Sequence, residues 1–193
     1  MRIINNKKRG LLFITALTLI STVSTGVTAN DGTITFTGSI ADTTCEISGG
    51  DETNPNQGTN FSVHLPPISV TALSASGKYA GDTRFFINLS GENCQNNKVA
   101  NVVFERAQSS QVDSTTGYLK NHIHTGAARN VQVRILNQDK TPLNLNLLNA
   151  EHQPVSITGK TAQFKYWGQY ASVNGASTAG TVETEVIYSI TYR

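Results

Sequence analysis

The amino-acid sequence predicts a globular domain of the all-β sandwich class. Its 193 residues are 38% hydrophobic and only 15% charged, a composition that excludes a disordered chain. Short β-branched or aromatic runs recur between polar stretches that contain glycine, which is the spacing that a β-sandwich produces. After residue 29, no window of 11 or more residues combines a helical hydrophobic period with helix caps.

The first 29 residues have the pattern of a secretory signal peptide. A basic cluster at residues 7–9 precedes an apolar run at residues 11–23, and residues 27–29 provide a small-x-small cleavage site. The apolar run of about 13 residues is shorter than the roughly 20 that a membrane-spanning helix requires. A buried helix is the weaker alternative, since the basic cluster would be poorly solvated. We therefore predict cleavage after Ala29 and export of a mature chain without membrane insertion.

Removal of the signal segment changes the charge balance. Four of the 15 Lys and Arg residues, and none of the 13 Asp and Glu residues, lie in the first 29 positions. The mature chain therefore carries 11 basic residues against 13 acidic ones, a net charge of −2. This balance gives no support to a nucleic-acid-binding function.

Six runs of the mature chain are predicted to form strands: residues 84–89, 99–105, 130–136, 143–147, 162–170 and 182–192. The stretch 66–82 begins with two prolines and is expected to hold at most a helical turn. Loops are predicted at residues 49–60, 107–117 and 172–180. No internal repeat and no Pro- or Ser-rich linker divides the chain, so we expect one mature domain.

Cys45 and Cys94 are the only two cysteines. Since an exported chain meets oxidising conditions, we expect them to form a disulfide. Metal ligands usually lie at short spacing and a catalytic thiol needs a histidine partner, so these alternatives are weaker. In the chain-entropy model, closing a loop of this length stabilises the fold by roughly 4 kcal/mol.

Both ends of the mature chain alternate between apolar and polar residues, as strands with one apolar face do. Near the N-terminus, one face carries Gly32, Ile34, Phe36, Gly38 and Ile40, with Thr and Ser between them. At the C-terminus, one face carries Val182, Thr184, Val186, Tyr188, Ile190 and Tyr192. The pattern alone is equally consistent with the first and last strands of a closed sandwich.

These features together resemble pilin subunits of the chaperone–usher pathway. The N-terminal Gly-x-Ile-x-Phe-x-Gly-x-Ile array lies five residues before Cys45, and the second cysteine follows about 50 residues later. Tyr192 is a penultimate aromatic residue, and Gly180 is fourteenth from the end. Residues 130–136 and 170–180 also resemble segments of type 1 pilus subunits, so the similarity covers nearly all of the mature chain. One departure is the stretch 51–60, which is longer than expected of a major shaft subunit and leaves the position in the fibre open.

The resemblance implies an incomplete immunoglobulin-like β-sandwich that lacks its seventh strand. Residues 43–193 would form this domain, and residues 30–42 would be a donor-strand extension that completes a neighbouring subunit. The implied donor positions are Gly32, Ile34, Phe36, Gly38 and Ile40, and the implied acceptor positions are Gly180, Val186, Tyr188, Ile190 and Tyr192. The implied partners are neighbouring pilin subunits, a periplasmic chaperone and an outer-membrane usher. The chain would then pass through the periplasm to a surface fimbria that contributes to adhesion.

An enzymatic function has little support in the sequence, and we expect neither a cofactor nor a metal. His122 and His124 form a close pair, but no third ligand lies near them. No nucleophile elbow, phosphate loop or dinucleotide motif is present. The main alternative to a pilin is a self-contained secreted sandwich that binds a carbohydrate or a receptor. In that case residues 30–42 would close their own sheet, and Trp167 and Tyr170 are candidates for a sugar site.

Overall fold

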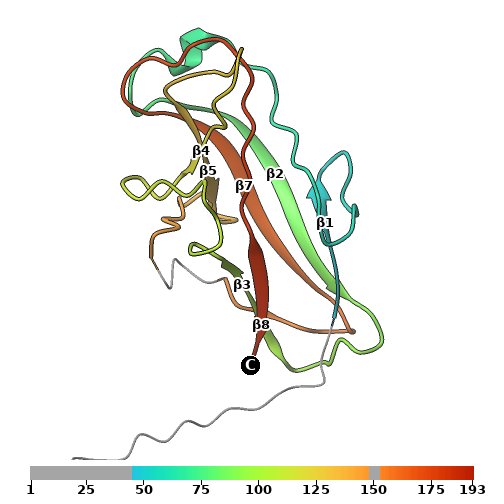
Figure 1. The fold of residues 1–193 in the computed structure, drawn as a ribbon. Helices are drawn as coiled ribbons and strands as arrows, with labels where there is room; N and C mark the ends of the chain where they lie inside the picture. The colour runs from blue at the N-terminus through green and yellow to red at the C-terminus, as the bar shows by residue number, and fades with distance from the viewer. Residues whose placement is uncertain (1–44, 148–152) are drawn as a thin grey trace, which may run out of the picture. The chain divides into compact units, whose positions relative to one another are not determined.

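The computed structural model of this protein describes residues 45–147 and 153–193, which form two antiparallel sheets (Figure 1). The order of the five-stranded sheet is β1 (Glu46–Asp51), β2 (Tyr79–Ser90), β7 (Ala162–Ser172), β5 (Val131–Leu136) and β4 (Leu119–Lys120). The order of the three-stranded sheet is β6 (Val155–Ser156), β3 (Val99–Phe104) and β8 (Tyr188–Tyr192). One short 3₁₀ helix, η1 (Val70–Leu73), precedes β2. No helix in the described ranges is long and apolar enough to cross a membrane.

The core lies between the two sheets and is built from alternate residues of the long strands. On β2, Phe85, Ile87 and Leu89 are buried. Phe85 and Ile87 face Tyr166 and Phe164 of β7 in the strand register. The ring of Tyr166 also lies 5.4 Å, centroid to centroid, from the ring of Phe104 on β3 in the other sheet. The period-two pattern of these strands therefore places one face of each sheet against the other.

A disulfide joins Cys45 to Cys94, as the sequence predicts. Both cysteines are buried and belong to the main core cluster. The bond ties the residue before β1 to the turn that follows β2. It therefore fixes the outer edge of the five-stranded sheet at the point where the described chain begins.

Most of the predicted strands are confirmed, and the differences have physical causes. Residues 143–147 form no strand, because Leu143 and Leu145 are buried by packing into the core from a turn-rich segment rather than by sheet pairing. The predicted helical turn within residues 66–82 is η1, whose first turn is capped by the Ser69 side chain. Strands β1, β4 and β6 are additional. Two of them are only two residues long, and β1 contains two adjacent glycines.

The predicted signal peptide at residues 1–29 and the predicted donor strand at residues 30–42 lie outside the described residues. The predicted C-terminal strand at residues 182–192 is described in full, but only Tyr188–Tyr192 pair as a regular ladder. Residues 181–187 are held by hydrogen bonds to side chains that belong to the candidate site.

Candidate strand-acceptor site

Strand β8 is an edge strand of the three-stranded sheet (Figure 1). It pairs with β3 on one side, in a register that runs from Phe104 opposite Tyr188 to Ala100 opposite Tyr192. No strand in the described part of the chain pairs with its other side. One edge of β8 is therefore open to a further strand.

The backbone direction along β8 shows which residues face the open edge. At one end of the ladder, the Glu105 amide donates to the Ile187 carbonyl at 2.8 Å. At the other end, Arg193 and Val99 exchange two backbone hydrogen bonds of 2.8 and 3.0 Å. In an antiparallel pair the hydrogen-bonded residues alternate, so the odd-numbered residues 187–193 bond to β3. The even-numbered residues Tyr188, Ile190 and Tyr192 therefore direct their N–H and C=O groups to the open edge.

The segment before β8 continues this arrangement with side chains in place of a partner strand. Asn121 is only 6% exposed; its Oδ1 accepts from the Glu183 amide at 2.7 Å, and its Nδ2 donates to the Thr181 carbonyl at 3.0 Å. The Ile187 amide donates to the Ser109 hydroxyl at 3.0 Å. Odd-numbered residues again face the protein, so the open edge extends from residue 182 to residue 192. Eleven extended residues span about 36 Å.

The even-numbered residues also carry a row of apolar side chains. Five of them are half-buried and pack against the main core cluster without being covered: Val182, Val186, Tyr188, Ile190 and Tyr192. Burial raises the pKa of the Tyr188 phenol, which reflects the apolar surroundings of this row. The same residues therefore present both unpaired backbone groups and apolar side chains.

The apolar row of β8 forms one wall of the candidate site. The second wall is the extended segment that follows β1. Phe61, Val63 and Leu65 are half-buried and pack against the same core cluster. The ring of Phe61 lies 5.9 Å from the ring of Tyr188, centroid to centroid. The Tyr188 hydroxyl also donates to the Thr59 carbonyl at 2.7 Å. The two walls thus contact each other around Tyr188, and the uncovered apolar side chains that they carry are called the acceptor groove.

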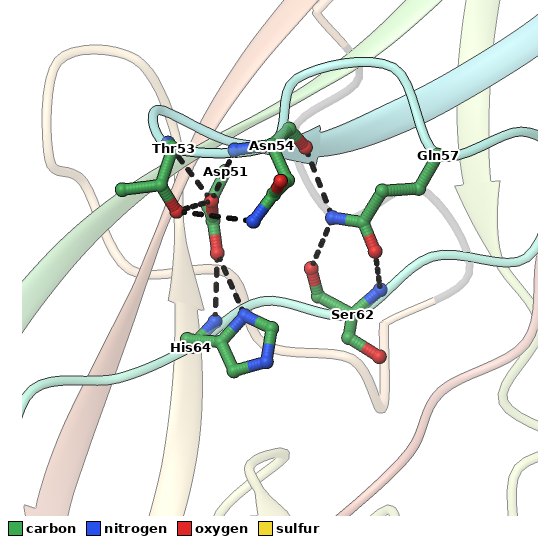
Figure 2. Close-up of polar contacts among 6 residues, drawn as sticks. All are labelled: Asp51, Thr53, Asn54, Gln57, Ser62 and His64. Atoms are coloured by element: carbon green, nitrogen blue, oxygen red, sulfur yellow. Dashed lines mark hydrogen bonds and ion pairs between the residues drawn. The ribbon is translucent and has the colours of Figure 1, made fainter.

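A buried carboxylate holds this second wall in place, as Figure 2 shows. The side chain of Asp51 is 4% exposed, and it accepts hydrogen bonds from the amides of Thr53, Asn54 and His64, each at 3.0 Å. It also accepts from the Thr53 hydroxyl at 2.6 Å and lies 3.1 Å from Nδ1 of His64. Burial alone would raise the pKa of the Asp51 carboxyl, but these hydrogen bonds outweigh it and hold the pKa far below its usual range.

Gln57 makes a second set of bonds within the same loop (Figure 2). Its Nε2 donates to the carbonyls of Asn54 and Ser62 at 2.9 and 3.0 Å, and its Oε1 accepts from the Ser62 amide at 3.2 Å. The long stretch 51–60 is thus a folded loop that positions Phe61 and the residues after it. Asp51 and Gln57 were not predicted from the sequence as site residues. One local signal was available: an Asp side chain often accepts hydrogen bonds from the backbone amides that follow it in a turn.

A pocket of about 210 Å³ lies at the end of the groove near residue 182. It is lined by Val182, Ile68, Leu73, Val131 and Tyr170, among others. Gly180 also lines it and has a φ of +152°. A Cβ added there would lie 2.4 Å from the Ala128 amide nitrogen, so only glycine fits without a shift of the backbone.

The predicted acceptor residues therefore fall into two places. Val186, Tyr188, Ile190 and Tyr192 lie in the apolar row, and Gly180 lies at the turn beside the pocket. The five predicted donor residues lie outside the described ranges.

The candidate residues for other functions are engaged in different contacts. The guanidinium of Arg84 and the ammonium of Lys140 lie 4.4 and 4.3 Å from the ring centre of Trp167. Tyr170 packs against the core and lines the pocket beside Gly180. Nδ1 of His124 lies 2.9 Å from the Thr125 carbonyl. None of these contacts assembles a recognisable catalytic arrangement.

The fold and the open edge define a class of protein: immunoglobulin-like β-sandwiches with an unpaired edge strand beside uncovered apolar side chains. In agreement with this, residues 34–193 match the family model described as "Fimbrial protein". Two curated relatives are the major fimbrial subunit SMF-1 of Stenotrophomonas maltophilia, 37% identical over 85% of this chain and 94% of that protein, and the F17 fimbrial protein of Escherichia coli, 34% identical over 91% and 94%. The chain therefore belongs to the fimbrial protein family, and it is a structural subunit of a pilus.

Solved structures agree with the fold. A subunit in the structure of a chaperone–usher pilus superimposes with a TM-score of 0.56 at 14% identity, over 85% of this chain and 96% of that one. The P pilus rod subunit PapA superimposes with a TM-score of 0.53 at 14% identity, over 77% of this chain and 99% of that one. The predicted chaperone–usher pilin fold is thus confirmed.

Proposed function

We propose that this pilus subunit polymerises by donor-strand exchange. Residues 30–42 of one subunit would enter the groove beside β8 of the next, with Gly32, Ile34, Phe36, Gly38 and Ile40 facing the core. A periplasmic chaperone would fill the groove first, and an outer-membrane usher would catalyse the exchange. The product is a head-to-tail fibre on the cell surface that contributes to adhesion.

The observation that carries this proposal is the coincidence of two features on the even-numbered residues 182–192. Their backbone groups face an open edge, and the side chains of most of them form the half-buried apolar row. An unpaired edge beside uncovered apolar side chains is an aggregation hazard that folded proteins normally cover. A strand added here would satisfy the backbone groups and bury the row in the same step.

The dimensions and energies of the donor segment fit this edge. Residues 32–40 span roughly 30 Å when extended, against about 36 Å for the open edge. Burial of Ile34, Phe36 and Ile40 stabilises by about 1.5 to 3 kcal/mol each, or roughly 5 to 9 kcal/mol together. Since the added strand completes the acceptor's own core, dissociation requires local unfolding, and we expect it to be very slow.

The same groove supports a role for a chaperone before assembly. After cleavage of the signal segment at Ala29, the mature chain would enter the periplasm with the edge of β8 uncovered. A chaperone strand that pairs with the open edge would protect it from aggregation until the usher delivers the next donor segment. We expect no catalytic activity, because the site is built from apolar side chains and backbone groups.

The proposal is tested by equilibrium urea unfolding of three mature chains. They are residues 30–193, the same chain without residues 30–42, and a chain in which residues 30–42 follow Arg193 through a flexible linker. We expect the shortened chain to be weakly stable or to aggregate, and the relocated chain to unfold as a far more stable monomer. If relocation brings no rescue, residues 30–42 belong to their own sheet, and the self-contained binding protein becomes the better account.

A further inference from the structure

Thr184 has a buried hydroxyl without a hydrogen-bond partner. The hydroxyl oxygen is one of two buried side-chain N or O atoms in the described ranges that have none. Thr184 lies between Val182 and Val186 on the segment that leads into β8, and strand alternation places it in the same row. A buried polar group without a partner costs free energy, so the unassembled chain carries a cost that a correctly placed partner would remove.

The backbone of Thr184 faces the open edge. The flanking residue Glu183 bonds to the opposite side through the side chain of Asn121 and the amide of His122. In an extended chain the next residue points the other way. An incoming residue opposite Thr184 would therefore exchange two backbone hydrogen bonds with it, and both side chains would lie on the inward face.

A glycine opposite Thr184 would give the hydroxyl a partner. A backbone carbonyl has two lone pairs, so it accepts from the Thr184 amide and still has one for the Thr184 hydroxyl. Because this hydroxyl is buried in the unassembled chain, the side chain must rotate about its Cα–Cβ bond toward the edge to reach that carbonyl. A Cβ on the incoming residue would stand beside the threonine side chain and keep the hydroxyl away from that carbonyl. The donor segment contains two glycines on its apolar face, Gly32 and Gly38.

Two alignments that place a glycine opposite Thr184 give all five donor positions an even-numbered partner within residues 182–192, and only the antiparallel one exchanges two backbone hydrogen bonds at Thr184. With Gly38 opposite Thr184 in an antiparallel strand, every other donor position has a partner on an even-numbered residue: Ile40 with Val182, Phe36 with Val186, Ile34 with Tyr188, and Gly32 with Ile190. Ile40 then lies at the pocket of about 210 Å³ that Val182 lines. With Gly32 opposite Thr184 in an antiparallel strand, Gly38 and Ile40 would extend past Gly180, where the chain turns away. A parallel strand with Gly38 at Thr184 would place Ile34 at that same turn. A parallel strand with Gly32 at Thr184 would pair all five donor positions, but in a parallel ladder no single residue exchanges two hydrogen bonds with Thr184.

We propose that Thr184 is a specificity-determining residue that fixes the register of the incoming strand by hydrogen bonding to the backbone of Gly38 of the neighbouring subunit. This inference rests on the proposed function, because it concerns the same groove. It adds a polar contact to a surface that otherwise selects only for apolar side chains of suitable size. An apolar row alone tolerates a slip of two residues, whereas a single hydroxyl does not.

The test measures binding of labelled synthetic peptides of residues 30–42 to the mature chain at concentrations where the chain is unassembled. The chain is used as wild type, as Thr184→Val, which keeps the shape, and as Thr184→Ser, which keeps the hydroxyl. We expect Thr184→Val to weaken wild-type peptide binding about three- to tenfold, and Thr184→Ser to restore it within about twofold. Gly38→Ala in the peptide should cost less in Thr184→Val than in wild type, and Gly32→Ala should cost the same in both.

Urea unfolding of the unassembled chains separates this role from a merely structural one. Because Thr184→Val removes an unpartnered polar group, we expect its unfolding midpoint to stay equal or to rise while peptide binding weakens. A fall in both, unchanged binding, or coupling to Gly32 in place of Gly38 would overturn the inference. If the wild-type peptide binds no better than a scrambled one, the proposed function fails; if it binds without coupling to Thr184, only the register assignment fails.

Discussion

The two walls of the acceptor groove are held by different means. The wall formed by β8 is fixed by a backbone ladder to β3, and its free edge continues that ladder outward. The wall formed by Phe61 and the residues after it has no ladder and depends on side chains, above all the carboxylate of Asp51. One wall therefore provides hydrogen-bonding groups for a new strand, whereas the other provides an apolar surface whose position depends on one buried charge.

The largest effect is expected from Asp51→Ala. The substitution leaves the amides of Thr53, Asn54 and His64 without their acceptor, so we expect a loss of about 2 to 4 kcal/mol in the free energy of unfolding. Binding of a residue 30–42 peptide should weaken as well, because the wall is released. Urea unfolding and peptide titration measure the two effects.

The matched control for this change is Asp139→Ala, an exposed aspartate that bonds to the Thr141 amide. We expect it to change the free energy of unfolding by no more than about 0.5 kcal/mol. Equal losses for the two variants would show that Asp51 has no special role in the second wall.

Lowering the pH should weaken the hydrogen bonds through which Asp51 holds the second wall. The pKa of Asp51 is lowered in the folded chain from its ordinary value of 3.8, so its contribution to stability is complete above that value and is lost as the pH falls below it. We expect the urea midpoint of the wild type to fall more steeply than that of Asp51→Asn between about pH 5 and pH 2. Asp82 and Asp113 also have lowered pKa values, but they titrate in both chains. Parallel pH profiles would contradict this assignment.

On the β8 side, Asn121→Ala should have a smaller effect of about 1 to 3 kcal/mol. The buried amide bonds to the backbones of Ala128, Thr181 and Glu183, and its loss frees the segment that leads into β8. The ladder from Tyr188 onward should remain intact, which hydrogen exchange of its odd-numbered amides would show. Exposed Asn93 provides the matched control, and a comparable loss in Asn93→Ala would remove the special role of Asn121.

The smallest effect concerns the contact between the two walls. Tyr188→Phe removes the hydrogen bond to the Thr59 carbonyl and keeps the ring against Phe61, so we expect a loss of about 0.5 to 1 kcal/mol. Tyr170→Phe, in which no described hydroxyl bond is lost, is the control. A loss above about 2 kcal/mol on Tyr188→Phe would mean that this one bond closes the groove.

The sequence predicted the β8 wall much better than the other. Alternation from Val182 to Tyr192 is a local pattern, so it identified the apolar row directly. It failed to show that the ladder begins only at Tyr188, because Asn121 and Ser109, which hold the preceding residues, lie more than 60 residues away in the chain. Residues 49–60 were predicted as a loop and the second wall after them was not predicted, since its position depends on hydrogen bonds to Asp51 and not on a hydrophobic period. Residues 143–147 were misread for a related reason: their leucines alternate, but Leu143 and Leu145 are buried without a partner strand and Leu147 is exposed.

The most direct test of the account is site-resolved amide hydrogen exchange of the mature chain before and after addition of the residue 30–42 peptide. The even-numbered residues of the segment 182–192 direct their N–H groups to the open edge. We therefore expect the amides of Thr184, Val186, Tyr188 and Ile190 to exchange rapidly in the unassembled chain and to become strongly protected when the peptide binds. The amides of Ser189 and Thr191 should be protected in both states, because they already bond to β3. If the even-numbered amides gain no protection, the added strand does not pair with β8, and donor-strand exchange at this edge is wrong.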